Sequence, residues 1–406
     1  MKALRLTAAF LLVLSSGVAA SRPAISDAGR KALSRFLRDG VARGDAPAVV
    51  AIVAAPDRIL YVGAFGKQSV AANVDATPDA IFRIASMTKP VTSLAAMMLV
   101  EAGTIELDDP VTKYLPDFRQ PPVLTHLDEN GTVESRPARR AIAVRDLLTN
   151  TSGIGYAFSD PSLARLNAAG TPDAELPLLH DPGAKWTYGS STGVLGRVIE
   201  RASGKTLDAF FKTRIFDPLG MKDTFYIVPA DKHDRVVTQH ATEAGAARSE
   251  RPNTATTLQS AVRGDGGLFS TARDYARFMQ VFLNGGRHGS VRLVTDRTIK
   301  LMTSNQIGRL TVERQPAANP AITSPFPMGA GKDRFGFGFQ IEAPPVKQGM
   351  RSAGSVSWGG IYNTHFWVDP QRQIAAAVLM QVLPFYDDAC VKLLRGFEHL
   401  VYQKLR

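Results

Sequence analysis

The feature that most constrains the fold is the placement of strand-like segments at the two ends of the chain. Near the N-terminus, "APAVVAIVAAPDRILYVGAFG" predicts two apolar strands around a Pro-Asp-Arg turn. Near the C-terminus, "RFGFGFQIEA", "THFWVDP" and "IAAAVLMQV" predict further antiparallel strands, the last two joined by a polar turn at residues 371–373. The sequence therefore predicts one α/β domain that is closed by both ends of the chain.

The segment between these ends is rich in Pro, Gly and short helical patterns and has few convincing strands. We therefore place the α/β part at residues 21–103 and 331–406 and a mainly helical insertion at residues 104–330. A chain of 406 residues is long enough to bury such a core. Catalytic clefts often lie where an insertion joins its parent domain, so we expect functional residues at this seam.

The first twenty residues have the pattern of a secretory signal peptide. Lys2 and Arg5 precede an apolar core from Ala8 to Leu14, and small residues end at Ala20. This core is too short to span a bilayer, and no cysteine follows the cleavage site to accept lipid. We expect an exported protein, periplasmic or secreted, without a stable membrane anchor.

Composition argues against several classes of function. The chain has 48 Lys and Arg against 37 Asp and Glu, but the basic residues are scattered rather than clustered with aromatics, as nucleic-acid binding would need. The single cysteine, Cys390, cannot form an intramolecular disulfide, and its surroundings predict a buried thiol on a C-terminal helix. The seven histidines form no metal-binding motif. We therefore expect no nucleic-acid partner, no metal and no cofactor.

The stretch "RIASMTKP" places a serine and a lysine three positions apart, ahead of an apolar helix predicted from Met87 to Val100. At this spacing the amine of Lys89 can lie beside the hydroxyl of Ser86 and act as its base. The free N–H groups at a helix start can also hold an oxyanion. An isolated Ser-x-x-Lys is, however, more often a helix cap followed by a surface lysine.

Two later elements can complete a site around Ser86. Tyr188, in "PGAKWTYGSSTG", lies on an apparent loop and is either a packing aromatic or a second acid/base group. In "SVSWGGIYNTHFWVDP", two glycines after Trp358 open an apparent edge strand and allow a ligand to approach the backbone. The N–H groups of Ser86 and Ile361 would then form an oxyanion hole.

A competing motif is "GSSTG" at residues 189–193, which matches the G-x-S-x-G elbow of α/β-hydrolases. Ser191 would then be the nucleophile, and a later Asp and His would complete a triad. Such an elbow follows a buried strand, whereas "DPGAKWTY" is rich in turn formers. This motif is the weaker of the two candidates.

In this order, the three elements around Ser86 resemble the serine β-lactamase and penicillin-binding superfamily, and more specifically the class C β-lactamase-like esterases called family VIII carboxylesterases. The stretches "LDDPVTKYLPDF", "VRDLLTNTSGIGY", "IFDPLGMKDTFY" and "GDGGLFSTARDYARFMQVFLNGG" also resemble that family, so the resemblance covers nearly the whole mature chain. It implies a β-lactamase/transpeptidase-like fold, an antiparallel sheet flanked by helices with a mainly helical insertion. The "RGD" at residues 263–265 overlaps the last stretch, and we interpret it as a coincidence.

The resemblance also assigns roles to individual residues. It makes Ser86 the acylated nucleophile, Lys89 its general base and Tyr188 the second acid/base group. Tyr156 becomes a candidate for the wall of the acyl pocket.

Two departures from the lactamase pattern affect the expected substrate. Ser190 stands at the asparagine of the lactamases' Y-x-N motif, and Trp358-Gly359-Gly360 stands at their Lys-Thr-Gly, in a form found in many of these esterases. Both changes remove groups that bind a β-lactam. The resemblance therefore implies a carboxylesterase acting on short acyl esters, with a small-molecule ester or amide as substrate. The alternatives are a β-lactamase, D-amino-acid peptidase or transacylase on the same site, and a non-catalytic penicillin-binding-like envelope protein.

Overall fold

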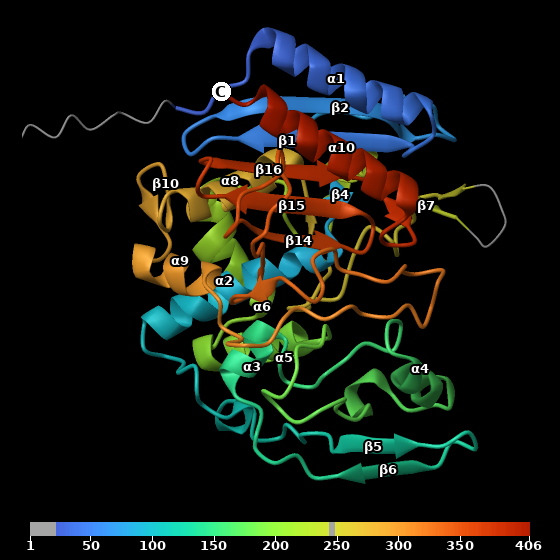
Figure 1. The fold of residues 1–406 in the computed structure, drawn as a ribbon, viewed down its shortest axis with the longest axis vertical. Helices are drawn as coiled ribbons and strands as arrows, with labels where there is room; N and C mark the ends of the chain where they lie inside the picture. Colours follow the sequence, from blue (N-terminus) through green and yellow to red (C-terminus); the bar gives the residue numbers. More distant parts are fainter. Residues whose placement is uncertain (1–21, 243–247) are drawn as a thin grey trace, which may run out of the picture.

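A computed structural model describes residues 22–242 and 248–406, and its main feature is an eight-stranded sheet (Figure 1). The predicted signal peptide lies outside the described residues. The strand order is β12-β13-β14-β15-β16-β1-β2-β3, and all neighbours are antiparallel. The strands are β1 (Ala48–Ala54), β2 (Ile59–Ser69), β3 (Val74–Asp75), β12 (Arg334–Phe335), β13 (Gln340–Ile341), β14 (Val356–Gly360), β15 (Thr364–Asp369) and β16 (Ile374–Leu379).

The sheet joins the two ends of the chain, as predicted. Strand β1 pairs with β16 in a register that sets Val50 opposite Leu379. The predicted hairpins β1–β2 and β15–β16 are confirmed. Every residue of β1 and β16 is buried, which explains why both segments are continuously apolar rather than alternating.

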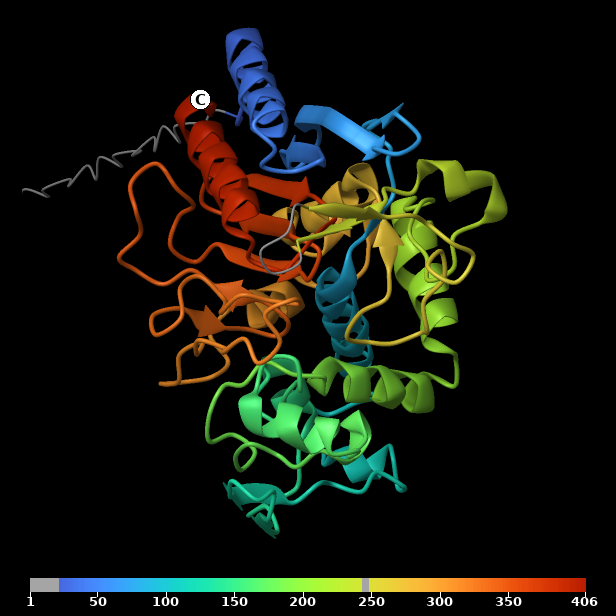
Figure 2. The ribbon, with the colours of Figure 1, turned by 90° about the vertical axis from the view of Figure 1, so that its right-hand side faces the viewer.

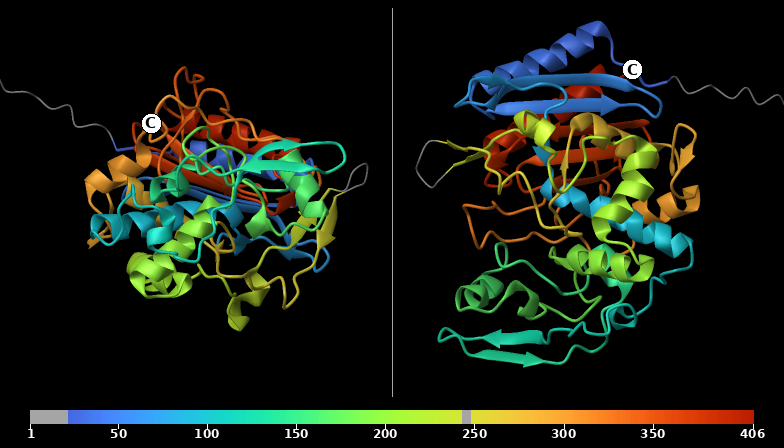
Figure 3. Two further views of the ribbon diagram at one scale, coloured as in Figure 1. Left: turned by 90° about the horizontal axis from the view of Figure 1, so that it is seen from below. Right: turned by 180° about the vertical axis from the view of Figure 1, so that it is seen from behind.

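Helices cover both faces of this sheet (Figures 1 and 3). On one face, α1 (Asp27–Ala42) and α10 (Asp388–Lys404) pack side chains such as Leu37 and Phe397 against Trp367 of β15. Ser26 caps α1 by accepting a hydrogen bond from the N–H of Gly29. On the other face lie α8 (Ala272–Leu283) and, between the sheet and the helical half of the molecule, α2 (Thr88–Glu101) (Figure 2).

Cys390 in α10 is fully buried, as predicted, and burial raises the pKa of its thiol well above the ordinary value. Within residues 22–242 and 248–406, the helices are all too short or too polar to cross a membrane.

The middle of the chain forms short helices and small sheets at the end of the molecule away from α1 (Figures 1 and 3). It also supplies α8, which packs against β1 and β16, so the sheet is not covered by the terminal segments alone. The predicted domain boundaries at residues 104 and 330 stay a prediction. The remaining helices are α3 (Val144–Thr149), α4 (Pro161–Ala168), α5 (Ser191–Ser203), α6 (Leu207–Phe211), α7 (Asp217–Leu219) and α9 (Asp296–Thr303). The remaining strands are β4 (Phe82–Arg83), β5 (Val123–Leu127), β6 (Val133–Arg136), β7 (Gln239–Ala241), β8 (Ser249–Arg251), β9 (Phe269–Ser270), β10 (Arg287–His288), β11 (Val291–Arg292) and β17 (Val382–Leu383).

Strand β14 differs from the predicted edge strand. It is the third strand from the edge, because β13 and β12 flank it. However, β13 pairs only with Val356 and Ser357, so the segment from Trp358 to Gly360 extends beyond it. The glycine-containing end of β14 thus keeps one side available for contacts other than strand pairing.

A buried ion pair ties α10 to the loop before β14. Nε and Nη2 of Arg351 each donate to the carboxylate of Glu398 at 2.9 Å, and Arg395 donates to it at the same distance. Glu398 is fully buried. Burial alone would raise the pKa of its carboxyl, but the charge and hydrogen bonds of Arg351 outweigh burial and the pKa is lowered.

We predict that Glu398→Gln lowers the free energy of unfolding by about 3 kcal/mol, because it leaves the buried Arg351 without a counter-charge. The control Asp75→Asn, which breaks the exposed pair with Lys67, should change it by less than about 0.5 kcal/mol. The folded-state pKa of Glu398 is lowered, so its ionised carboxylate contributes to the free energy of unfolding above the ordinary carboxyl pKa of 4.5. This contribution is lost as the pH falls from 4.5 through the folded-state pKa. Urea unfolding at pH 7 and at low pH measures both effects. A Glu398→Gln protein as stable as the control would contradict the prediction.

Candidate active site

Ser86 lies in a single 3₁₀ turn, η1 (Ala85–Met87), directly before α2. The segment is fixed in space because β4 pairs with β9 and the N–H of Ile84 donates to the carbonyl of Leu268 at 2.9 Å. Ala85 has a φ of 44°, in the left-handed region, which costs a non-glycine residue roughly 1–2 kcal/mol. This strained residue begins the turn and places the half-buried Ser86 in its middle, ahead of α2.

Lys89 is buried beneath Ser86 and has three hydrogen-bond partners. Its Nζ lies 3.2 Å from Oγ of Ser86, 3.0 Å from the hydroxyl of Tyr156 and 2.6 Å from the carbonyl oxygen of Asp265. The side chain is only 2% exposed. The lysine is therefore not the surface residue that an isolated Ser-x-x-Lys would suggest.

Tyr188 faces the same lysine with its ring. The ring centroid is 4.8 Å from Nζ of Lys89, and Tyr188 also packs against Trp358 and Phe326 at 5.0 and 5.5 Å between centroids. Within the part of the chain that the structure describes, the Tyr188 hydroxyl makes no hydrogen bond. Together with Ser86, Tyr188 lines a pocket of about 400 Å³.

Tyr156 makes polar contacts that the sequence did not predict. Its hydroxyl accepts from Lys89 and donates to Oδ2 of Asp265 at 2.6 Å, and Arg263 donates two hydrogen bonds to the same carboxylate. Burial, followed by the charge of Asp265, raises the pKa of Tyr156 well above its ordinary value of 10. Burial alone would raise the pKa of Asp265, but the charges of Lys89 and Arg263 lower it. The "RGD" interpreted as a coincidence therefore supplies both ends of an ion pair beside the lysine.

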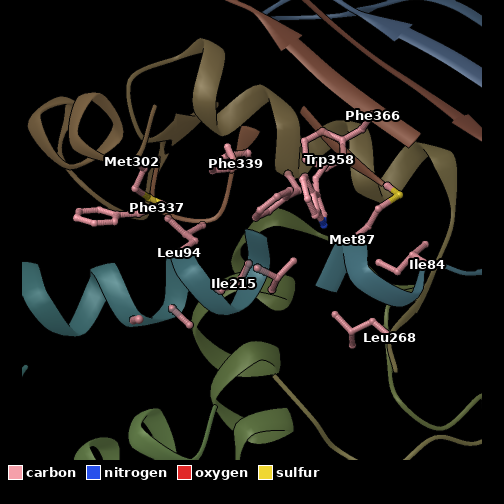
Figure 4. Packing of buried hydrophobic residues seen from close by; sticks show 14 of the residues in the cluster. Ile84, Met87, Leu94, Ile215, Leu268, Met302, Phe337, Phe339, Trp358 and Phe366 are labelled. Carbon is pink, nitrogen blue, oxygen red and sulfur yellow. The ribbon is translucent and has the colours of Figure 1, made fainter. Parts of the chain in front are cut away.

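The end of β14 lies against the segment that carries Ser86. A Cβ on Gly360 would come within 2.2 Å of the carbonyl oxygen of Ile84, so only glycine fits there. Figure 4 shows Trp358 of β14 and Phe366 of β15 packed in the core with Met87 and Ile84. The contact at Gly360 brings Ile361, the predicted oxyanion-hole residue, to the same pockets as Ser86.

Two pockets meet at Ser86, and both also contain Phe158 and Ile361. The first, of about 400 Å³, has Gly359 and the aromatic side chains of Tyr188, Phe326 and Trp358 in its wall. The wall of the first pocket also has charged side chains, among them Lys332, Glu342 and Arg351. The second, of about 470 Å³, includes Tyr156 and the polar residues Arg83, Gln239, Ser260, Arg263 and Asp265. The site can thus hold two chemical groups on either side of the Ser86 hydroxyl.

Comparisons with known proteins identify the family. The family model described as Beta-lactamase matches residues 33–400. The chain belongs to the β-lactamase family. Over 340 residues it is 31% identical to monacolin J acid methylbutanoyltransferase of Aspergillus terreus, which covers 79% of this chain and 81% of the relative. Over 390 residues it is 29% identical to esterase EstB of Burkholderia gladioli, which covers 87% of this chain and 90% of the relative.

The fold agrees with this assignment. Unliganded simvastatin synthase (LovD) from Aspergillus terreus matches with a TM-score of 0.79 and 26% identity, covering 93% of this chain and 99% of that chain. The predicted β-lactamase/transpeptidase-like fold and the resemblance to the serine β-lactamase and penicillin-binding superfamily are confirmed.

Two serines beside Tyr188 have different positions in this β-lactamase-family structure. Ser190 precedes α5, is half-buried and is not among the described residues that line the two pockets at Ser86. Ser191 is fully buried at the start of α5, and its hydroxyl is 2.8 Å from that of Ser152. A buried hydroxyl cannot reach a substrate, so the structure argues against the G-x-S-x-G elbow. Among the described residues, no group of His, Cys, Asp or Glu is arranged to hold a metal ion.

We predict that Ser191→Ala keeps ester hydrolysis within about twofold of wild type and lowers stability by about 1 kcal/mol through loss of the bond to Ser152. Kinetics on p-nitrophenyl butyrate and thermal unfolding check both parts. Loss of activity in a folded Ser191→Ala protein would restore the elbow as a candidate.

We predict that Gly360→Ala lowers kcat/KM at least about 100-fold, because its Cβ must push β14 away from Ile84 and displace the backbone near Ser86. Gly266→Ala is a matched control. Its Cβ would meet the backbone of Ala85 at 3.9 Å, an ordinary contact, and its kcat/KM should stay within about threefold of wild type. Equal kcat/KM values for the two variants would contradict the inference that the close contact of Gly360 with Ile84 positions Ser86.

Proposed function

We propose that this β-lactamase-family enzyme is an exported serine hydrolase that acts on short acyl esters through an acyl-enzyme on Ser86. The observation that carries the proposal is the pair of Ser86 and a buried Lys89, 3.2 Å apart, at the wall of a pocket lined with aromatic side chains. A relative named esterase and a relative named methylbutanoyltransferase support an ester as the substrate.

Acylation begins when the neutral amine of Lys89 takes the proton of the Ser86 hydroxyl. The Oγ then forms a bond to the ester carbonyl carbon, and the carbonyl π electrons move to the oxygen. The N–H groups of Ser86 and Ile361 are the proposed donors to this oxyanion. When the intermediate collapses, the bond to the alcohol oxygen breaks and the leaving alkoxide takes the proton from Lys89, either directly or through Tyr188, which gives its own proton and regains one from Lys89. The amine of Lys89 is then neutral again.

Deacylation repeats these steps with water in place of Ser86. The water loses a proton to the same base and attacks the acyl carbon, and the bond to Oγ breaks as Ser86 regains its proton. An alcohol that occupies the second pocket would react in the same way, which is acyl transfer rather than hydrolysis. The presence of two pockets at Ser86 favours this transfer as a second activity of the site.

The residues at two positions that would bind a β-lactam in the lactamase pattern favour esters over β-lactams. Trp358 stands at the lactamase lysine, is 8% exposed and packs against Trp186, Tyr188 and Phe335, so this position offers no cation for a carboxylate. Ser190 replaces the asparagine that would meet the lactam amide. β-Lactamase or D-amino-acid peptidase activity is therefore the less favoured alternative. A non-catalytic penicillin-binding-like protein would acylate without turnover.

Export belongs to the same proposal. It rests on the charged, apolar and small-residue pattern of residues 1–20.

We predict that wild-type enzyme releases a burst of p-nitrophenol from p-nitrophenyl acetate or butyrate, followed by steady turnover. Ser86→Ala should abolish the burst and lower kcat/KM at least about 10³-fold, because no other group can accept the acyl chain. Nitrocefin and D-alanyl peptides, assayed in parallel, should be turned over far more slowly than the esters. A Ser86→Ala protein with full activity would rule out the proposal, and a burst without turnover would favour the non-catalytic alternative.

A further inference from the structure

A second layer of polar groups lies behind Lys89. The Tyr156 hydroxyl donates to Oδ2 of Asp265 at 2.6 Å and accepts from Nζ of Lys89 at 3.0 Å. Nε and Nη2 of Arg263 donate to the same carboxylate at 2.9 and 2.7 Å. A continuous chain of hydrogen bonds therefore runs from Arg263 through Asp265 and Tyr156 to Lys89 and on to Ser86.

This chain has a fixed direction, because a carboxylate can only accept hydrogen bonds. The Tyr156 hydroxyl donates its hydrogen bond to Asp265, which leaves the phenol oxygen as an acceptor toward Lys89. The carbonyl oxygen of Asp265, 2.6 Å from Nζ, is also only an acceptor. A neutral amine has two N–H donors, and these two acceptors use both. Its lone pair is then left for the remaining neighbour, the Ser86 hydroxyl at 3.2 Å.

We propose that Asp265 and Tyr156 are positioning residues that direct the lone pair of Lys89 at Ser86, and that Arg263 moderates how strongly the Asp265 charge favours the protonated amine. The inference rests on the proposed roles of Ser86 and Lys89. The three residues also line the second pocket, but the proposed effect on the reaction passes through Lys89.

The charges near Lys89 act in opposite directions. The loop after α3 brings Tyr156, the loop before α5 brings Tyr188, and the turn before β9 brings Asp265 with Arg263. The Asp265 side chain is 1% exposed, so its negative charge is weakly screened and favours a protonated amine. The Arg263 side chain is 58% exposed and its positive charge opposes this effect more weakly. Neutralising Asp265 should therefore make the protonated form of Lys89 less favourable. Neutralising Arg263 should make it more favourable.

The test is the pH dependence of kcat/KM for p-nitrophenyl butyrate, whose acid limb reports protonation of the base in the free enzyme. In Asp265→Asn, the midpoint of the acid limb should move down by about one pH unit, because the carboxylate no longer favours the ammonium. The plateau should fall at least about tenfold, because a neutral amide accepts from the Tyr156 hydroxyl more weakly than a carboxylate and holds the phenol oxygen less firmly as an acceptor toward Lys89. In Arg263→Gln, the midpoint should move up by about 0.3 pH unit with little change in the plateau.

Two further variants complete the series. Tyr156→Phe should lower the plateau of kcat/KM at least about tenfold while KM changes less than about twofold, since Lys89 loses an acceptor while the aromatic ring in the wall of the second pocket is kept. Arg136→Gln is the matched control, because it breaks a 2.7 Å ion pair with Asp181, far from Ser86 in the β5–β6 region, and should leave the midpoint unchanged.

The outcomes separate this proposal from the proposed function. A Ser86→Ala protein that still gives a burst would remove the role of Ser86, whatever the pH profiles. If the burst depends on Ser86, midpoints that do not move, or that move the same way in Asp265→Asn and Arg263→Gln, overturn the positioning proposal alone. Full activity in Tyr156→Phe does the same. Should Asp265→Asn fail to fold, the Arg263→Gln and Tyr156→Phe variants still test whether these residues position Lys89, because Arg263 is partly exposed and its substitution should not disturb folding.

Discussion

The pairing of β1 with β16 is the contact on which the rest of the structure depends. It closes a loop of nearly the whole chain, but the entropic cost of closure grows only as the logarithm of loop length. Two fully buried apolar strands offset that cost. Because β15 and β14 extend the sheet from β16, the position of β1 fixes where the end of β14 lies. There Gly360 meets the carbonyl of Ile84, and the turn that carries Ser86 is held against the sheet.

Much of this architecture could be predicted because the information is local. The turn at residues 55–58, the polar turn at residues 371–373 and the apolar run of α2 each follow from a few neighbouring residues. Helix α2 begins at Thr88, one residue after the predicted start, because the chain first makes the 3₁₀ turn at Ser86. The stretch "RFGFGFQIEA" predicts a strand, but in the structure only its two ends pair, as the two-residue strands β12 and β13. Its sequence does not tell that β13 pairs with the start of β14. That is why β14 was predicted as an edge strand.

The candidate site was predictable only in part, for a different reason. The resemblance to a known family gave Ser86, Lys89 and Tyr188, whose catalytic roles stay proposals. It did not give the bonds of Tyr156 to Lys89 and Asp265, because they join segments 67 and 109 residues apart. Nor does sequence tell which of two tyrosines points its hydroxyl at the lysine. In the structure Tyr188 presents its ring to Nζ while Tyr156 presents its hydroxyl, and this difference separates their proposed tasks.

The same geometry bears on the choice between hydrolysis and acyl transfer. In the proposed mechanism both reactions share the acylation of Ser86 and differ only in the molecule that attacks the acyl carbon. Lys89 is held by Tyr156 and Asp265 in one orientation behind Ser86, and Ser86 lines both pockets, so in this proposal one base serves either attacker. The catalytic groups therefore do not discriminate between water and an alcohol. In this proposal discrimination would rest with the second pocket, where a bound alcohol would displace water and receive the acyl group.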